Sequence, residues 1–205
     1  MFRTNTLLGH YQTNNRLDKI ESILTRLDAP ATLRNLSTMN PRGFAGSLRL
    51  LQQVSEFPPE QVSVSAEIIK SLSEKLRAIP ETSPDYWPTV LQFIQFASSS
   101  MVSPADVPPV DAPYNARISN LKCSPGAHCI IASHKKIILD GGDIPGSRFE
   151  NCRIIFTQNP VKMKDVKFIN CVFEMPVTDA PSPYLKSTSQ FLLASDLSSV
   201  EIPSL

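Results

Sequence analysis

The chain has little glycine, little cysteine and no excess of charge of either sign. Its 205 residues include 7 Gly, 4 Cys and 1 Trp, and 20 Lys and Arg face 19 Asp and Glu, which leaves a net charge of +1. So few cysteines exclude a disulfide-dense mini-protein, and so few glycines exclude a collagen-like repeat. Hydrophobic residues make up 41% and charged residues 19%, which excludes intrinsic disorder and is typical of a globular protein.

Long hydrophobic runs are also missing. The most apolar stretch, residues 90–97, is interrupted by glutamines and is far too short to cross a bilayer. Only Leu7 and Leu8 follow Arg3 before the chain turns polar, which is not the pattern of a secretory signal. We therefore expect a cytoplasmic protein with no membrane insertion by the chain as given. An anchor preceding Met1 in a longer natural protein is the alternative, and it would make the protein membrane-tethered.

Basic residues do not gather into a patch. Lys162, Lys164 and Lys167 form the most basic cluster, near Lys135 and Lys136, but acidic residues are interspersed among them. Proteins that bind duplex DNA draw most of their affinity from a basic surface that neutralises phosphates. The cluster therefore predicts a solvated strand face and no nucleic-acid partner.

Apolar periodicity predicts a helical first half. Apolar residues spaced by three and four positions indicate helices over 14–28, 42–56, 60–78 and from Ser83 to about Ala97. Pro30 is expected to close the first helix, whereas Pro84 suits the first turn of the fourth. The apolar faces carry no polar residues suited to catalysis, so we expect a bundle-like α-helical domain. Trp87, Phe93 and Phe96 are expected in its core, with a partner surface as the alternative.

Proline marks the expected domain boundary. Of the 18 prolines in the chain, Pro104, Pro108, Pro109 and Pro113 fall close together. This density prevents a helix and favours an extended linker. We therefore expect an α-helical domain over 1–102, a proline-rich linker over 103–116 and a second domain over 117–205.

A five-residue period begins at Ile137. The central position of each five is large and apolar, namely Leu139, Ile144, Phe149, Ile154, Met163, Phe168 and Phe173. The run Phe149-Glu-Asn151-Cys152 recurs as Phe168-Ile-Asn170-Cys171. Such self-similarity predicts a solenoid in which the central side chains share one interior and equivalent residues stack in successive coils. Asn151 and Asn170 suit its corners, because asparagine tolerates the left-handed backbone conformation.

Residues 137–175 thereby resemble the pentapeptide-repeat proteins, and they are similar to short β-solenoid modules in bacterial proteins of unknown role. The resemblance implies a short right-handed β-helix, built in that family from about four fives per coil, and it implies no catalytic residues. Val161 and Val166 depart from the pattern because they occupy positions that are usually small. DNA mimicry, known in some members, is disfavoured because acidic and basic residues balance in this segment.

The fold class expected overall is α+β, an α-helical domain followed by a short right-handed β-helix. A pair of antiparallel β-hairpins is the alternative for the same residues, with residues 153–156 and 166–168 as strands. Two coils leave open strand edges, which invite association unless they are covered. A short helix from about 187 to 195 is expected to cap the stack, and dimerisation through one end would serve the same need.

One cluster of residues has the composition of a metal site. Cys123, His128, Cys129 and His134 are acceptable zinc ligands, but their spacing is not a usual one. A surface loop next to a buried strand is the favoured interpretation, and a Cys123–Cys129 disulfide is possible only in an oxidising compartment. We therefore assign no metal, cofactor-binding or catalytic residue, and no cofactor.

Two further kinds of chemistry are disfavoured. A Cys129 or Cys152 nucleophile activated by His128 or His134 would lack an orienting partner in the sequence, and Cys152 and Cys171 suit small core positions. A single Asp140-Gly-Gly-Asp143 run does not make a calcium-binding repeat, which needs several copies.

The sequence favours a non-enzymatic interaction or assembly protein that binds a protein partner or itself. Its expected homo-oligomer would dissociate on substitution of Phe173 or Phe191 by Asp. A metal-dependent enzyme using Cys123, His128, Cys129 and His134 is one alternative, and an accessory protein anchored by a segment outside this chain is another.

Overall fold

The computed structural model describes residues 28–58, 62, 64–118 and 130–203. This part of the chain is a mixed α+β structure with parallel sheets. Its helices are α2 (Ala29–Thr38), α3 (Pro41–Ala45), α4 (Leu48–Ser55), α5 (Ala66–Arg77), α6 (Tyr86–Ser100) and α7 (Pro183–Ala194). Its strands are β1 (Ala116–Ile118), β2 (Ile131–Ser133), β3 (Lys136–Leu139), β4 (Gly142–Pro145), β5 (Arg148–Glu150), β6 (Arg153–Phe156), β7 (Val161–Lys164), β8 (Val166–Ile169), β9 (Val172–Glu174) and β10 (Ser199–Ile202).

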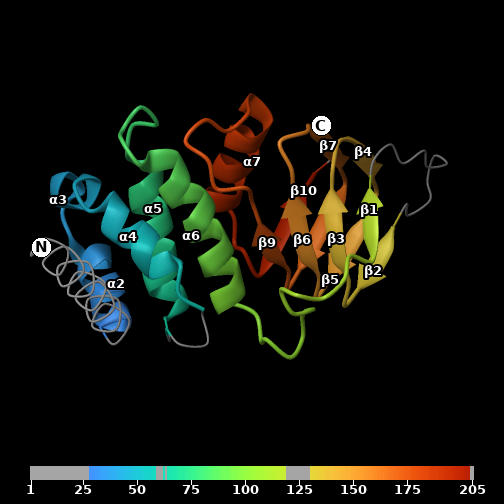
Figure 1. Ribbon diagram of the computed structural model, residues 1–205, viewed down its shortest axis with the longest axis horizontal. Helices are drawn as coiled ribbons and strands as arrows, with labels where there is room; N and C mark the ends of the chain where they lie inside the picture. The colour runs from blue at the N-terminus through green and yellow to red at the C-terminus, as the bar shows by residue number, and fades with distance from the viewer. Residues whose placement is uncertain (1–27, 59–61, 63, 119–129, 204–205) are drawn as a thin grey trace, which may run out of the picture.

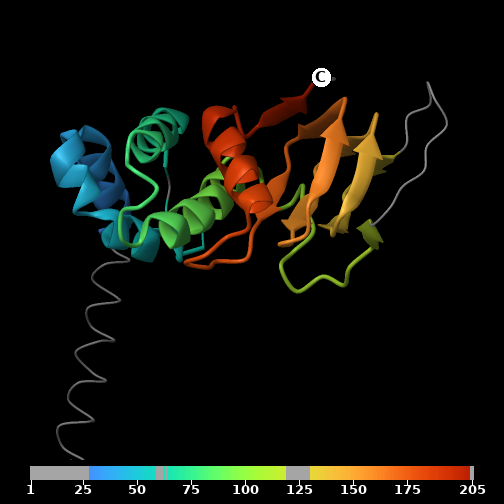
Figure 2. The same cartoon turned by 90° about the horizontal axis from the view of Figure 1, so that it is seen from above.

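Helices and strands occupy opposite ends of an elongated molecule. Helices α2 to α6 form one end and strands β1 to β9 the other, while α7 returns to lie beside α6 and next to the strands (Figure 1). The view from above shows the same order along the long axis (Figure 2). None of the helices in the described residues is long and apolar enough to cross a membrane.

The predicted helices form, but their limits differ. The single helix expected over 42–56 is two helices, because the backbone leaves helical geometry around Gly46 and Ser47, and glycine and serine are weak helix formers. The helix expected over 60–78 begins only at Ala66, after the N-cap residue Ser65. The fourth expected helix corresponds to α6 and runs on to Ser100.

Pro30 begins a helix, although the sequence analysis expected it to end one. Pro30 lies in the first turn of α2. Backbone N–H groups of the first turn make no hydrogen bond within the helix, so the missing N–H of proline costs nothing there. The helix expected over 14–28 lies outside the described residues except for Asp28, which precedes α2. Helix α7 starts earlier than expected, at Pro183, and Ser182 caps it by accepting the N–H of Leu185 at 3.3 Å.

The strands form three sheets. Sheet A has the order β1-β3-β6-β9, sheet B the order β2-β5-β8-β10, and sheet C pairs β4 with β7. From β2 to β9 the chain visits sheets B, A and C in turn, and all pairs among these strands are parallel. Only β10 runs antiparallel, beside β8. The hairpin alternative is therefore wrong, since β6 and β8 lie in different sheets.

The apolar centres of the repeat share one core. Leu139, Ile144, Phe149, Ile154, Phe168 and Phe173 are fully buried in the same hydrophobic cluster, and Met163 is partly buried against it. Phe149 pairs with Phe168 in the strand register, and their rings stack at a centroid distance of 5.2 Å. The predicted shared interior and this stacking are confirmed.

The same core continues into the helices. Helix α6 packs against β9, where the backbone N–H of Phe173 donates to Oγ of the buried Ser98 at 3.0 Å. Trp87, Phe93 and Phe96 are all buried, as expected for core aromatics. One contiguous cluster therefore joins α2 to α7 with the sheets.

The proline-rich segment packs across the outer face of sheet A. We name residues 103–115 the strap. Val107 of the strap packs with Val102 and Val172, and Arg153 donates from Nε to the carbonyl of Pro108 at 2.8 Å. The ammonium of Lys136 donates to the carbonyl of Val110. Sheet A is therefore covered inside by the core and outside by the strap.

Candidate interaction site

Three of the four candidate metal ligands, Cys123, His128 and Cys129, lie outside the described residues. His134 is described and stands at the corner between β2 and β3, with φ 53°. Its Nδ1 is hydrogen-bonded to Oγ of Ser133 at 2.7 Å. Its Nε2 lies 3.5 Å from the side-chain amide nitrogen of Asn151. Within residues 28–58, 62, 64–118 and 130–203, no three His, Cys, Asp or Glu side chains gather as a metal site would require.

Equivalent corners repeat this left-handed conformation. Asn151 has φ 51° and Asn170 has φ 49°, so the left-handed conformation predicted for these asparagines is confirmed. The backbone N–H of Asn151 donates to the carbonyl of Ile169 at 2.9 Å, which ties one turn to the next. His134, Asn151 and Asn170 therefore act in the fold as corner residues.

Cys152 and Cys171 follow these corners and are fully buried. The Cys152 thiol donates to the carbonyl of Glu150 at 3.2 Å, and the Cys171 thiol donates to that of Ile169 at 3.3 Å. The hydrogen bond with Cys152, together with burial, raises the pKa of the Cys171 thiol. The hydrogen bond with Cys171 lowers the pKa of the Cys152 thiol to about 7, but Cys152 is fully buried like Cys171. Burial keeps both thiols away from a substrate, so the pair packs as part of the core.

The two acidic residues of the candidate calcium run have different surroundings in the structure. Asp140 accepts hydrogen bonds from Thr157 at 2.7 Å and Asn159 at 2.8 Å, and these bonds hold the pKa of its carboxyl below the ordinary value. Asp143 is exposed on β4. Asp140 therefore fastens one turn to the next.

The two ends of the strand stack differ. At one end β10 covers β8, α6 covers β9, and α7 packs against α6. At the other end β1, β2 and β4 are the outermost strands of their sheets among the described residues. We name this second end the open end (Figure 1).

A cavity of about 500 Å³ lies at the open end. It lies beside β1 and β2 and is lined by Asn115, Ala116, Arg117, Ile118, Ile130, Ala132, Lys135 and Ile137. Its wall is mostly apolar, and its charged lining residues are both basic. We name it the end pocket.

Strand β2 borders this pocket and carries an exposed apolar side chain on its outer face. Ile131 is 71% exposed, the highest value for any large hydrophobic side chain in the described part of the chain. The carbonyl of Ile130 accepts from Arg148, and the N–H of His134 donates to Glu150, so these groups face β5. Because backbone groups alternate along a strand, those of Ile131 and Ser133 face away from β5, toward the open end.

The edge of β4 is less suited to pairing. The N–H of Gly146 donates to the carbonyl of Lys164 on β7 at 2.8 Å. By the same alternation, position 145 faces outward, and Pro145 has no N–H to donate there. Among the outermost strands β2 and β4, β2 is therefore the better template for an added strand.

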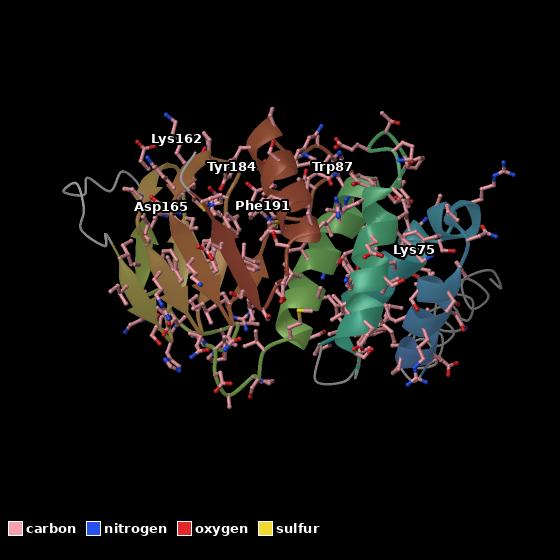
Figure 3. The ribbon with its side chains drawn as sticks, turned by 180° about the vertical axis from the view of Figure 1, so that it is seen from behind. Lys75, Trp87, Lys162, Asp165, Tyr184 and Phe191 are labelled. Atoms are coloured by element: carbon pink, nitrogen blue, oxygen red, sulfur yellow. The ribbon has the colours of Figure 1, made fainter. Side chains whose placement is uncertain are left out.

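Two other places, one hollow and one exposed, are less suited to binding. A cavity of about 350 Å³ lies between α4, α6 and the strap, but its Gln92 donates to the carbonyl of Ser55 and its Arg153 bonds Glu174 and the strap. On the face drawn in Figure 3, Phe191 of α7 is 38% exposed and stands alone as a large exposed apolar side chain of its helix. Single exposed apolar residues are normal on protein surfaces.

Sequence reasoning missed β1 and the end pocket. The run Asn115-Ala116-Arg117-Ile118 has a single large apolar residue, which is too few to show a period. Comparison of the chain with protein-family models, with curated proteins and with solved structures finds no match to any of them.

Proposed function

We propose that the protein is a non-enzymatic interaction module built on a short right-handed β-solenoid, which binds a protein partner through its open end. In this proposal β2 to β9 are successive sides of coils, with one strand of each coil in each sheet. The cyclic order of sheets B, A and C supports it, as do the parallel registers. Right-handedness is supported by the general rule that about 98% of parallel crossovers have that hand.

The difference between the two ends carries the proposal. A strand stack with a bare end is an association hazard, and natural proteins cover such edges unless they use them. Here one end is covered by β10 and α6, whereas β2 leaves Ile131 largely exposed beside an apolar pocket. An apolar pocket beside an open strand edge fits recognition of a protein segment.

Of the residues considered for catalysis or metal binding, those in the described part of the chain are engaged in the fold, whereas Cys123, His128 and Cys129 lie outside it. His134 bonds Ser133 and lies close to Asn151, Asp140 bonds Thr157 and Asn159, and Cys171 is buried. These contacts favour the interaction function over an enzyme.

Site-specific crosslinking tests the proposal. A photoreactive benzoylphenylalanine placed at position 131 reports what touches the open end, and the same residue at position 191 on α7 is the matched control. We expect position 131 to crosslink a protein from native extract, with competition by unlabelled wild-type chain, and position 191 not to do so. Equal capture at both positions, or none at 131, would contradict the proposal.

Self-association is tested with the purified chain. Light scattering over a concentration series gives the molecular mass. An oligomer held by the open end should dissociate on Ile131→Asp and persist on Phe191→Asp, and both side chains lie at the surface. Dissociation on Phe191→Asp alone would place self-association on α7 and outside the open end. Phe173 is fully buried, so Phe173→Asp tests folding and not assembly. A monomer at all concentrations would contradict self-association and would leave a different protein as the partner of the open end.

A further inference from the structure

The open end is stepped. Sheet A extends to β1, one strand beyond β3, whereas sheet B ends at β2, the strand that directly precedes β3 in the chain. The position beyond β2 therefore lies beside the inner face of β1, and the end pocket is lined by residues of both strands. A strand added there would extend sheet B to the same level as sheet A.

The edge of β2 offers the backbone groups that such a strand needs. The N–H and C=O of Ile131 and Ser133 face the open end, and no described strand pairs with them. Pairing with an extended segment supplies affinity through main-chain hydrogen bonds, while alternate side chains supply specificity. One set of alternate side chains would enter the end pocket and contact Ile118, Ile130 and Ile137.

The charges at the rim select the chemistry of that segment. Arg117 and Lys135 line the pocket, and none of its lining residues in the described part of the chain is acidic. Arg117 forms an ion pair with Asp140 at 3.4 Å, yet 64% of its side chain is exposed. Charges at the rim of an interface favour a partner of opposite sign and disfavour one of like sign. A second copy of this chain would bring the same basic rim, so an acidic partner fits better.

Resting on the proposed function, we infer that the open end binds an extended segment of another protein in which apolar residues alternate with acidic ones, as an added strand on β2. Affinity comes from the backbone of residues 131 and 133 and from the apolar pocket. Selectivity comes from Arg117 and Lys135.

Fluorescence anisotropy with labelled peptides tests the inference. The probe is a short peptide in which valine alternates with glutamate and threonine, and its matched control carries lysine in place of glutamate. With the full chain at low ionic strength, we expect the acidic peptide to bind at least about tenfold more tightly. Lys135→Glu should remove this preference, and Lys162→Glu, an exposed lysine of β7 labelled in Figure 3, should not.

Two substitutions at position 131 separate the contribution of the backbone to peptide binding from that of the side chain. Ile131→Pro removes an N–H that faces away from β5, so the sheet keeps its bonds while the added strand loses a donor. Ile131→Thr keeps that N–H. We expect binding to fall at least about tenfold for Pro and to stay within about threefold for Thr. Circular dichroism confirms folding, and Lys135→Glu carries the test if the Pro variant does not fold.

The outcomes distinguish the inference from the proposed function. If neither peptide binds although position 131 still crosslinks a partner, or if both bind equally, the inference is wrong and the function stands. If position 131 crosslinks only a second copy, or only residues 119–129 of the same chain, the inferred occupant is wrong. If neither a peptide nor a crosslinked protein engages position 131, both proposals are overturned.

Discussion

Single residues set the corners of the strand stack. His134, Asn151 and Asn170 each adopt the left-handed conformation at equivalent corners. Asparagine adopts this conformation at low energetic cost because its short side chain forms hydrogen bonds with the nearby backbone. A β-branched side chain clashes with its own backbone in the same conformation. Cys152 and Cys171 come directly after two of these corners and are buried.

Asn170→Val tests this corner. We expect it to lower the free energy of unfolding by about 1–2 kcal/mol, because valine strains a φ of 49°. Asn170→Gly, which removes the same side chain without the strain, should cost less. Urea denaturation measures both, and equal stability of the two variants would show that the amide and not the backbone matters.

Tyr184 illustrates an incompletely satisfied residue. Its hydroxyl, labelled in Figure 3, lies near Thr188 and the backbone of Val161, but neither contact has the geometry of a full hydrogen bond. Tyr184→Phe removes this buried polar atom, so we expect stability to rise by about 1 kcal/mol. A clear loss on urea denaturation at neutral pH would point to a hydrogen bond, for instance with water.

The same residue predicts a pH dependence. Burial raises the pKa of Tyr184 from 10.0 to about 12. Between pH 10 and pH 12 the unfolded chain therefore binds fewer protons than the folded one, and this residue makes stability fall as the pH rises. The advantage of Tyr184→Phe over wild type should grow in this window, as measured by urea midpoints at pH 8 and pH 11. An unchanged advantage would contradict burial as the cause.

At the scale of elements, the strap is fixed by charged side chains. Arg153 bonds Glu174 at 2.6 Å and the carbonyl of Pro108, and the two charged side chains are only 9% and 17% exposed. Removing one partner of such a pair leaves a buried charge without compensation, while removing both costs less. The strap therefore depends on the pair as a unit.

A double-mutant cycle measures this dependence. We expect Arg153→Met and Glu174→Met each to cost about 2–4 kcal/mol, and the double variant to cost less than their sum by about 1–3 kcal/mol. The exposed pair Lys167 and Glu201, 3.5 Å apart, is the control, with an expected coupling below about 1 kcal/mol. Limited proteolysis within residues 103–115 should quicken in Arg153→Met. Additive losses would mean that the two charges do not act together.

The elements were predictable where an apolar period repeats along the sequence and where one residue type by itself favours a backbone conformation. The apolar centres from Leu139 to Phe173 repeat often enough to define an interior, and the asparagine corners follow from one residue type. Pro30 misled because a proline can end one helix or begin the next, and only the fold decides. The packing of the strap and the shape of the open end could not be predicted. Both depend on contacts between segments far apart in the sequence, and the short irregular runs that form them show no periodic pattern.

At the scale of the molecule, helices and strands share one core. The hydrophobic cluster runs from Leu33 in α2 to Val200 in β10, and α6 bonds β9 through Ser98 and Phe173. Elements that share a core unfold together, even when a proline-rich segment joins them. The proposed division into domains over 1–102 and 117–205 would instead allow two transitions.

Two probes distinguish these behaviours. Trp87, the only tryptophan, reports on the helices, and the buried thiols of Cys152 and Cys171 report on the strands. In a Cys123→Ser/Cys129→Ser variant, we expect tryptophan fluorescence and thiol labelling to give the same urea midpoint. Separate midpoints would show that the two halves unfold independently.

The antiparallel strand β10 has a consequence for the size of any complex. It runs against β8 at the covered end, so that this end does not repeat the parallel pattern of the other. A polymer by head-to-tail addition needs each unit to offer a donor face that matches the acceptor face of the next. If the open end accepts an added strand, as we propose, the described residues of the covered end offer β10 in the opposite direction and no parallel copy of sheet B. We therefore expect head-to-tail addition of identical units not to propagate.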